Sequence, residues 1–546
     1  MLQAMNRDRV RGFLDTRGTK LVNERGQEVL LTGWGLGNWL LPEGYMWLAG
    51  GPRMDRPRTI ERIVEEVAGR EYAARFWKRF RENYIRREDI ARMAELGYNS
   101  VRIPINARLF LEEGPGLNWV DEGFALLDRC IDWCEEFGVY AFIDLHGAPG
   151  GQTGSNIDDS IDNLPRLFTD EDSFWKGVEL WRKLAERYCD RWIVGGYDIL
   201  NEPLRPAQFE GQQDTACLLP ELRRFYHEAI AAIRSVDQRH VLSIEGHHWA
   251  SDPEIFDEKF DDKLLIHFHR YACLPDKKCY EPFLEASERL GSPLWLGETG
   301  ENVHEWFAAM YPLAAELGIG FNIWPWKKMN CKNSPCSVNK PEGWDAITAY
   351  AKGGPHPGYE QAQAALDEYL DNMLLENCAE NAVLHDAIFR RPGCTIRATD
   401  FDEVGGEGVA YHSVRKALNP FGYREDTGME IVEKQKDAKK EFGFDCLWRR
   451  FALGLEQGEY ACYTLNDISG IVRLEVHCSC SGAARVSVWQ DGEQLGVYPL
   501  GGIGSEKLVI GGLRLRSAER SVLRVQVESG RVEVDSLVTL REKIAP

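Results

Sequence analysis

Short apolar runs alternate with amphipathic stretches over roughly the first 350 residues, and this alternation restricts the fold more than any other feature of the chain. Most runs are continuously apolar, as expected of parallel strands that are covered on both faces. Between them, apolar residues recur at helical spacing, for example Phe124, Leu127, Ile131 and Cys134. Repeated strand–helix units of this kind predict a parallel sheet. The expected strands are residues 29–33, 99–103, 140–145, 196–200, 240–244, 264–268, 294–297 and 320–324.

Eight such strands with crossovers in about 300 residues predict an α/β fold, a closed (β/α)8 TIM barrel, with a doubly wound open sheet as the alternative. Residues 11–28 are expected to form a hairpin beneath the barrel, turning at residues 23–26. The helical stretch 359–375 is expected to close the barrel. We therefore assign residues 1–376 to a barrel domain.

The pattern changes after an expected linker at residues 377–390. Short β-rich runs separated by Gly and Asp turns replace the helical periodicity, which predicts a C-terminal β-sandwich over residues 391–546. The runs are residues 471–477, 485–489, 508–510, 521–527 and 532–540.

Charge and hydropathy exclude two classes of partner. Sixty-five Lys and Arg against 86 Asp and Glu give a net charge of −21, which repels phosphate backbones and argues against nucleic acid. No apolar run approaches the roughly 18–20 residues that a bilayer span needs, so no membrane partner is expected. An uncharged ligand fits this composition better, and the oligomeric state stays open.

The cysteines and the N-terminus bear on location. Fourteen Cys are too few for a disulfide scaffold of this length, and none has the spacing of a zinc site. The first residues, MLQAMNRDRVRGFL, lack the apolar core of a secretory signal. We expect reduced thiols in the cytoplasm, or a secreted protein if an export signal has been removed. We expect no metal.

Two glutamates stand where barrels place their chemistry, at the carboxyl ends of the strands. Glu202 in YDILNEP and Glu298 in LWLGETG each follow an apolar strand directly. A single Glu at such a rim often pairs with an Arg, but two on one rim are the pair that glycoside hydrolysis requires. Other polar or aromatic residues at these strand ends are Arg102, His146, Asn201, His269, Tyr271 and Trp324.

These motifs, in this strand order, resemble glycoside hydrolase family 5 over roughly residues 12–376. The segments LTGWGLGNWLLPE, LHGAPGGQTGSN and ILNEPL are most similar to its exo-β-1,3-glucanase branch. The resemblance implies a retaining mechanism with Glu202 as acid/base and Glu298 as nucleophile. GETGEN in place of GEW or GEF, and HFHRY in place of a double-His form, depart from the branch and leave the linkage open.

Elementary electrostatics supports these two roles. Two carboxylates about 5 Å apart repel by about 3 kcal/mol at an effective dielectric constant near 20, so one stays protonated near neutral pH. Arg102 and the hydroxyl of Tyr271 are expected to hydrogen-bond Glu298 and keep it ionised. Glu202 then serves first as the acid and later as the base.

The remaining candidates are substrate-binding residues. Asn201 is placed to bind the sugar 2-hydroxyl, and His146 and His269 to bind sugar hydroxyls or Glu298. Trp324 can present its face to a pyranose ring. The weaker candidates Trp39, His248 and Trp326 compete with an interpretation as core or loop packing.

The expected function is hydrolysis of β-glucosides or β-glucan oligosaccharides without a cofactor. Long segments at residues 35–58 and 147–164 are able to wall off the site, which favours exo action. The alternatives are an endo-acting family 5 glycanase of cellulase or mannanase type, and a catalytically inactive glycan-binding barrel.

The C-terminal part resembles a family 6 carbohydrate-binding module over about residues 391–542, in IRATDFDEVGGEGVAYHS, YREDTGMEIV and GLEQGEYACYTL. The resemblance implies that Tyr411 and Trp489 could stack a sugar, and that a structural Ca²⁺ could lie near Asp400 or Asp535. The alternative is a sandwich that only braces the barrel.

Overall fold

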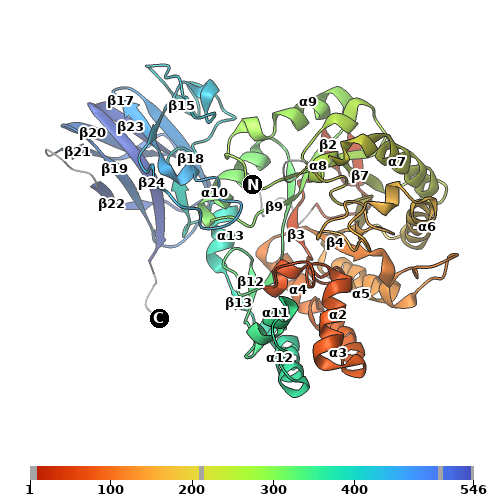
Figure 1. Cartoon of the computed structure of the whole chain (residues 1–546). Coiled ribbons are helices and arrows are strands. Elements are labelled where there is room, and N and C mark those ends of the chain that lie inside the picture. The colour runs from red at the N-terminus through yellow and green to blue at the C-terminus, as the bar shows by residue number, and fades with distance from the viewer. Residues whose placement is uncertain (1–8, 208–213, 502–507, 543–546) are drawn as a thin grey trace.

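Two units, a barrel and a β-sandwich, lie side by side in the computed structural model, which describes residues 9–207, 214–501 and 508–542 (Figure 1). Parallel strands close the barrel in the order β10-β3-β4-β5-β6-β7-β8-β9. The closed order confirms the predicted TIM barrel and excludes the open doubly wound sheet. The strands are β3 (Thr32–Gly35), β4 (Ser100–Asn106), β5 (Tyr140–Gly147), β6 (Val194–Asp198), β7 (Val241–Glu245), β8 (Leu264–Arg270), β9 (Leu294–Thr299) and β10 (Gly320–Ile323).

Helices cover the outside of the barrel, because each strand–helix unit buries one apolar helix stripe against the sheet. On α5, for example, Phe124, Leu127, Ile131 and Cys134 are buried. The helices are α2 (Pro57–Ala68), α3 (Arg70–Asn83), α4 (Arg87–Leu96), α5 (Asp121–Phe137), α6 (Glu171–Tyr188), α7 (Leu219–Arg234), α8 (His247–Ala250), α9 (Glu281–Leu290), α10 (His304–Glu316), α11 (Trp344–Ala351), α12 (Tyr359–Asn372) and α13 (Ala382–Ile388). Within the described ranges, none is long and apolar enough to cross a membrane.

One sequence prediction needs correction at the N-terminal end of the barrel domain. The N-terminal hairpin, β1 (Asp15–Arg17) with β2 (Lys20–Val22), turns at Gly18, where φ is +59°, a conformation that glycine adopts without strain. The predicted turn at residues 23–26 exists, but as a second turn that leads to the bridge Val22–Glu28. The stretch predicted to close the barrel is α12, which packs on α2 and α3 (Figure 1).

The C-terminal unit consists of two antiparallel sheets, consistent with the predicted β-sandwich. One has the order β16-β17-β24-β19-β22, with β14 also pairing β24, and the other the order β15-β18-β23-β20-β21. Buried and exposed residues alternate along β19 and β24, as in a sheet with one face on the core. The strands are β14 (Thr395–Arg397), β15 (Tyr411–His412), β16 (Glu430–Glu433), β17 (Phe451–Glu456), β18 (Tyr460–Ile468), β19 (Val472–Ser479), β20 (Ala484–Gln490), β21 (Glu493–Leu500), β22 (Leu508–Leu515), β23 (Ala518–Ser529) and β24 (Arg531–Arg541).

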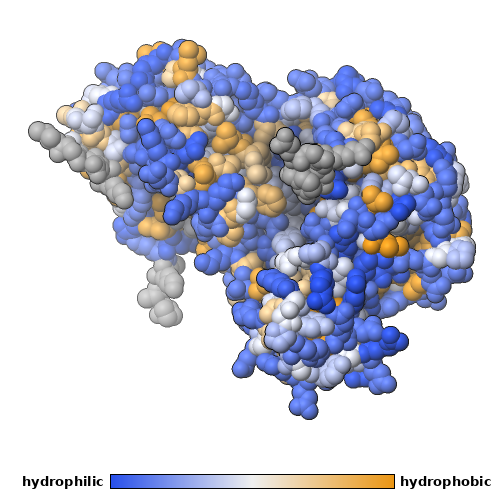
Figure 2. Space-filling view, viewed as in Figure 1, coloured by the Kyte–Doolittle hydropathy of each residue, from blue (hydrophilic) through white to orange (hydrophobic). Residues whose placement is uncertain are grey.

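The two units contact each other through α10 and α13, which lie between them (Figure 1). Buried arginines cross the boundary: Arg390 donates to the carbonyl of Ala308 at 2.7 Å, and Arg424 of the sandwich domain approaches Asp276 of the barrel. Figure 2 shows a groove between the units with apolar surface gathered on its sandwich side. The units therefore share a packed interface.

Candidate active site

The barrel brings the two predicted glutamates to one rim. Glu202 follows β6 and Glu298 lies in β9, and both side chains are largely buried. One carboxylate oxygen of each, together with a ring nitrogen of His269, form a group in which all atoms lie within 4.8 Å of one another. This separation matches two carboxylates that act on opposite sides of one bond with no water between them.

Glu298 is held in its ionised form. Arg102 Nη1 donates to its Oε2 at 2.7 Å, and the hydroxyl of Tyr271 donates to its Oε1 at 2.7 Å, so both predicted contacts are present. Burial alone would raise the pKa of Glu298, but His269, Arg102 and the Tyr271 hydrogen bond outweigh it and lower the pKa.

Glu202 has the opposite proton affinity. Burial raises its pKa to about 7, and the hydrogen bond with His269 Nδ1 at 2.7 Å only partly offsets this effect. Repulsion from Glu298, which the sequence argument made the main cause, contributes less than burial. The backbone N–H of Glu202 donates to Glu245 Oε2 at 2.6 Å, which fixes the residue in the left-handed region at φ +43°.

Arg102 is buried at the centre of the site and binds four carboxyl groups. Its guanidinium binds Asp198 at 2.7 Å, Glu245 at 3.0 Å and Asp144 at 3.1 Å, besides Glu298. Burial raises the pKa of Glu245 to about 8 and that of Asp144 well above its ordinary value. Although burial opposes it, His267 and Arg102 lower the pKa of Asp198. Of the four carboxyl partners of Arg102, Asp198 and Glu298 are the two whose pKa values are lowered.

Sequence reasoning missed four of these side chains: Asp144, Asp198, Glu245 and His267. Asp144, Asp198 and His267 lie inside the predicted strands rather than after them, which is why the search of strand ends passed over them. Glu245 directly follows the predicted strand 240–244 and was overlooked. A usable signal existed, because a charged residue within a fully buried strand must find a partner inside the barrel.

A row of hydrogen bonds links two of the missed residues to Glu202. His267 Nδ1 lies 3.0 Å from Asp198 Oδ1, and His267 Nε2 lies 3.1 Å from Nε2 of His269, which in turn contacts Glu202. Gly297 leaves room for this row, since a Cβ at that position would lie 2.0 Å from His267 Nε2. The row fixes the ring of His269 against the carboxyl group of Glu202.

Three predicted substrate-binding residues line the same rim. Asn201 accepts from Arg102 through its Oδ1 at 2.7 Å, and its Nδ2 lies 3.3 Å from His146 Nε2. His146 Nδ1 pairs with Asp144 at 2.7 Å, and burial lowers the pKa of His146 to about 4, so the ring is neutral. Trp324 lies parallel to the His146 ring with an interplanar angle of 4°, and its Nε1 donates to the Tyr45 hydroxyl at 2.9 Å.

Three weaker candidates lie elsewhere. Trp39 is buried and donates to the carbonyl of Arg81, and Trp326 is buried and donates to Asp89, so both are core residues bound to outer helices rather than residues of the rim. His248 is partly exposed after β7 and pairs with Asp214 at 3.0 Å.

The candidates in the sandwich domain are also occupied by protein contacts. Tyr411 is buried against Phe401, and the ring of Trp489 is covered by Arg524 at 4.6 Å. Asp400 accepts from Tyr423 and Trp448, and Asp535 pairs with Lys434 at 3.2 Å. Both carboxyl groups therefore have protein partners in this structure.

Two groups near the glutamates have ligand atoms close enough for a metal ion: Glu245, His267 and His269, and Glu202, His269 and Glu298. Both ring nitrogens of His269 already take part in the hydrogen-bond row, and Glu298 is bound by Arg102 and Tyr271. The donor set is thus satisfied by protein groups.

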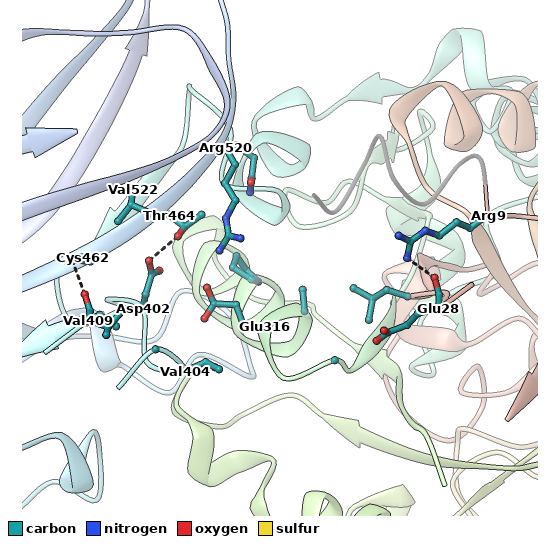
Figure 3. Close-up of a pocket in the computed structure, with 17 residues that line it drawn as sticks. Arg9, Glu28, Glu316, Asp402, Val404, Val409, Cys462, Thr464, Arg520 and Val522 are labelled. Carbon is teal, nitrogen blue, oxygen red and sulfur yellow. Dashed lines mark hydrogen bonds between the residues drawn. The ribbon is translucent and has the colours of Figure 1, made fainter. Parts of the chain in front are cut away.

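A pocket of about 610 Å³ lies between the two units, away from the glutamates (Figure 3). Arg9 and Glu28 line it from the barrel side, Glu316 from α10, and Asp402 and Arg520 from the sandwich domain. Glu28 and the end of α10 precede β3 and β10, so the pocket lies at the amino ends of the strands. The carboxylate pair is at the carboxyl ends, so this pocket is not the catalytic site.

Residues 65–352 match the family model described as Cellulase (glycosyl hydrolase family 5). The chain belongs to glycosyl hydrolase family 5. A β-xylosidase of Phanerodontia chrysosporium is 32% identical over 301 residues, which cover 54% of this chain and 59% of that protein. The chain therefore spans less than two thirds of that relative.

Other family 5 relatives carry different names. A glucan 1,3-beta-glucosidase of Candida oleophila is 26% identical over 346 residues, covering 58% of this chain and 76% of that protein. Endoglucanase C of Acetivibrio thermocellus is 26% identical over 198 residues, covering 36% of this chain and 53% of that protein.

Proposed function

We propose that the protein is a retaining β-glycosidase with Glu298 as nucleophile and Glu202 as acid/base. One observation carries the proposal: two buried carboxylates on one rim, with oxygens within 4.8 Å, whose surroundings drive their pKa values in opposite directions. Retaining glycosidases need this pairing of an ionised and a protonated carboxyl group.

In the first step, a carboxylate oxygen of Glu298 attacks the anomeric carbon while the bond to the leaving oxygen breaks. The proton of Glu202 moves to that oxygen, so the leaving group departs as an alcohol and Glu298 becomes a glycosyl ester. Arg102 and Tyr271 hold the two oxygens of Glu298 at 2.7 Å each, so the nucleophile needs little reorientation.

In the second step, the charge that opposed ionisation of Glu202 has disappeared, because Glu298 is esterified. Glu202 is then able to accept a proton from water, and the resulting hydroxide oxygen attacks the anomeric carbon and releases Glu298. The sugar leaves with its original β configuration, after two inversions.

Three residues are proposed to bind the sugar. Asn201 has its oxygen occupied by Arg102 and one N–H of Nδ2 directed at His146, so the second N–H of Nδ2 is the group that could donate to a hydroxyl such as the sugar 2-hydroxyl. The neutral ring of His146 and the indole of Trp324 stand parallel to each other at the same rim. Trp324 offers an apolar face to the C–H side of a pyranose.

We favour exo action on β-glucosides or β-glucan oligosaccharides. Exo action agrees with the names of two relatives, a β-xylosidase and a glucan 1,3-beta-glucosidase. The endo alternative is supported by Endoglucanase C and stays open.

For the sandwich domain, glycan binding is a second proposal. A pocket of about 820 Å³ on this domain is lined by Tyr460, Trp489 and Arg524. The proposal predicts that Trp489→Ala no longer binds laminarin but hydrolyses an aryl glycoside as fast as the wild-type protein. Equal laminarin binding by Trp489→Ala and wild type would instead favour a sandwich domain that only braces the barrel.

The experiment that tests the main proposal compares Glu202→Gln and Glu298→Gln with Glu186→Gln, whose carboxyl group is exposed on α6. With a panel of 4-nitrophenyl β-glycosides, we expect kcat to fall by about 10³-fold or more in the first two variants and to stay unchanged in the third. Single sugars from laminarin indicate exo action, and a ladder of oligomers indicates endo action. Full activity of either glutamine variant would refute the proposal.

A further inference from the structure

A loop of the sandwich domain reaches the nucleophile's hydrogen-bond partner. Residues 441–447 lie between β16 and the short helix Trp448–Arg450. Within this loop, the ring of Phe444 packs on the ring of Tyr271 with centroids 4.6 Å apart and planes tilted by 32°. Tyr271 belongs to the barrel and donates its hydroxyl to Glu298. Only one side chain thus separates the second domain from the nucleophile.

The barrel also binds the backbone of Phe444. The buried side chain of Asn302 donates through Nδ2 to the Phe444 carbonyl at 2.9 Å, and its Oδ1 accepts from the N–H of Val303 at 2.9 Å. Asn302 follows β9, the strand that carries Glu298. The loop is therefore fixed at two points, one beside the nucleophile strand and one on Tyr271.

The loop is also held in shape from within its own domain. Asp445 is fully buried and accepts hydrogen bonds from the N–H groups of Glu441 and Leu447 and from Arg449 Nη2 at 3.0 Å. A buried carboxylate with three donors keeps such a loop in one conformation. Phe444, by contrast, is 38% exposed. Burial of its ring in the hydrophobic core therefore does not explain why a Phe stands at this position.

We propose that Phe444 is a positioning residue of the active site, which holds the Tyr271 ring so that its hydroxyl stays on Glu298. The inference rests on the proposed role of Glu298. Without the Phe444 ring, one face of Tyr271 loses its aromatic partner and gains freedom to turn, and the hydrogen bond to Glu298 weakens. The sandwich domain then supplies part of the catalytic site rather than an independent module.

The test is a double-mutant cycle in the full-length chain. Phe444→Ala, Tyr271→Phe and the double variant are assayed on a 4-nitrophenyl β-glycoside that the wild-type protein cleaves. We expect Phe444→Ala to lower kcat/KM by about tenfold, and the double variant to be no worse than Tyr271→Phe alone, because both changes remove the same interaction. Phe444→Tyr should restore most of the activity, since it keeps the ring.

The pH dependence of kcat/KM distinguishes a positioning role of Phe444 from a purely structural one. Since the Tyr271 hydrogen bond lowers the pKa of Glu298, its weakening raises that pKa, and the acid limb of kcat/KM moves to higher pH in Phe444→Ala. The other titratable groups near Glu298 and Tyr271 are unchanged in this variant: Glu43, Tyr45, Arg102, His146, Glu202, His269 and Glu301.

Phe421→Ala is the matched control, because Phe421 packs on Phe451 within the sandwich domain. Phe444→Ala activity within twofold of wild type, or losses that add in the double variant, would overturn the inference. Failure of the proposed function is distinguishable, because it would appear as undiminished activity in Glu298→Gln or as no activity of the wild-type protein on any glycoside.

Discussion

Glu202 and Glu298 carry the same carboxyl group, yet the protein gives them opposite proton affinities. Glu298 faces Arg102 and the Tyr271 hydroxyl, both at 2.7 Å, whereas Glu202 faces His269 and the carboxyl group of Glu245. Burial is similar for both, so the difference comes from the neighbours. One residue is thus ready to attack and the other ready to donate a proton.

This difference predicts a bell-shaped pH dependence of kcat/KM. Glu202 must be protonated and has a pKa of about 7, so activity should fall as the pH rises through about 7. Glu298 must be ionised and has a lowered pKa, so the acid limb should lie below the ordinary range of glutamate. With a dinitrophenyl glycoside, which needs no acid, Glu202→Ala should lose the basic limb. A basic limb that persists in this variant would mean that another group sets it.

The two glutamates were accessible from the sequence, because each follows an apolar strand and barrel strands end at one rim. The role of Asp144, Asp198 and Glu245 was harder to predict. All three bind Arg102, and which side chains meet inside the barrel depends on the register of several strands. Trp39 and Trp326 are buried and bonded to the outer helices, and the sequence could not reveal this, since an aromatic residue beside a strand end has the same sequence signature in the core as at the rim.

At the scale of elements, close packing between β8 and β9 explains the glycine before the nucleophile. The Gly297 position faces His267, and the absence of a Cβ lets the imidazole lie against the backbone of β9. Strand existence and order were predictable from apolar runs, because helices cover every barrel strand. The hairpin turn was not, since residues 17–20 and 23–26 both carry turn residues and only pairing selects between them.

Gly297→Ala should therefore damage catalysis more than folding. The new Cβ would lie 2.0 Å from His267 Nε2, so His267 must move and His269 loses its partner beside Glu202. We expect kcat/KM to fall by about 100-fold, a loss typical of a misplacement near 1 Å, with a stability cost of about 1–3 kcal/mol. Gly50→Ala is the control, because a Cβ there meets no atom within 4 Å. Equal kcat/KM values for the two variants would contradict the claim that His267 positions His269 against Glu202.

At the scale of the whole molecule, the two units are joined by buried polar contacts as well as apolar ones. Arg424 of the sandwich domain is fully enclosed, where it pairs with Glu403 at 2.9 Å, and its backbone N–H donates to Asp276 of the barrel. The sequence predicted the barrel and the β-sandwich but not the contacts between them, because a single sequence does not reveal which surfaces of two domains pack together.

Arg424→Ala should lower the free energy of unfolding by about 3–5 kcal/mol, because it leaves Glu403 without its partner in the interface. Urea denaturation followed by circular dichroism measures this loss. The control Lys20→Ala breaks the exposed pair with Glu28 and should cost less than about 1 kcal/mol. Similar denaturation midpoints for Arg424→Ala and wild type would indicate that the interface contributes little to stability.

The most direct test of the central claim is the product that Glu298→Ala forms with azide. On an activated aryl β-glycoside, this variant should be nearly inactive alone and should regain turnover with sodium azide, which occupies the space of the missing carboxylate. Proton NMR should then identify an α-glycosyl azide, formed by a single inversion. A β-glycosyl azide, or no rescue in a folded variant, would contradict a covalent intermediate on Glu298.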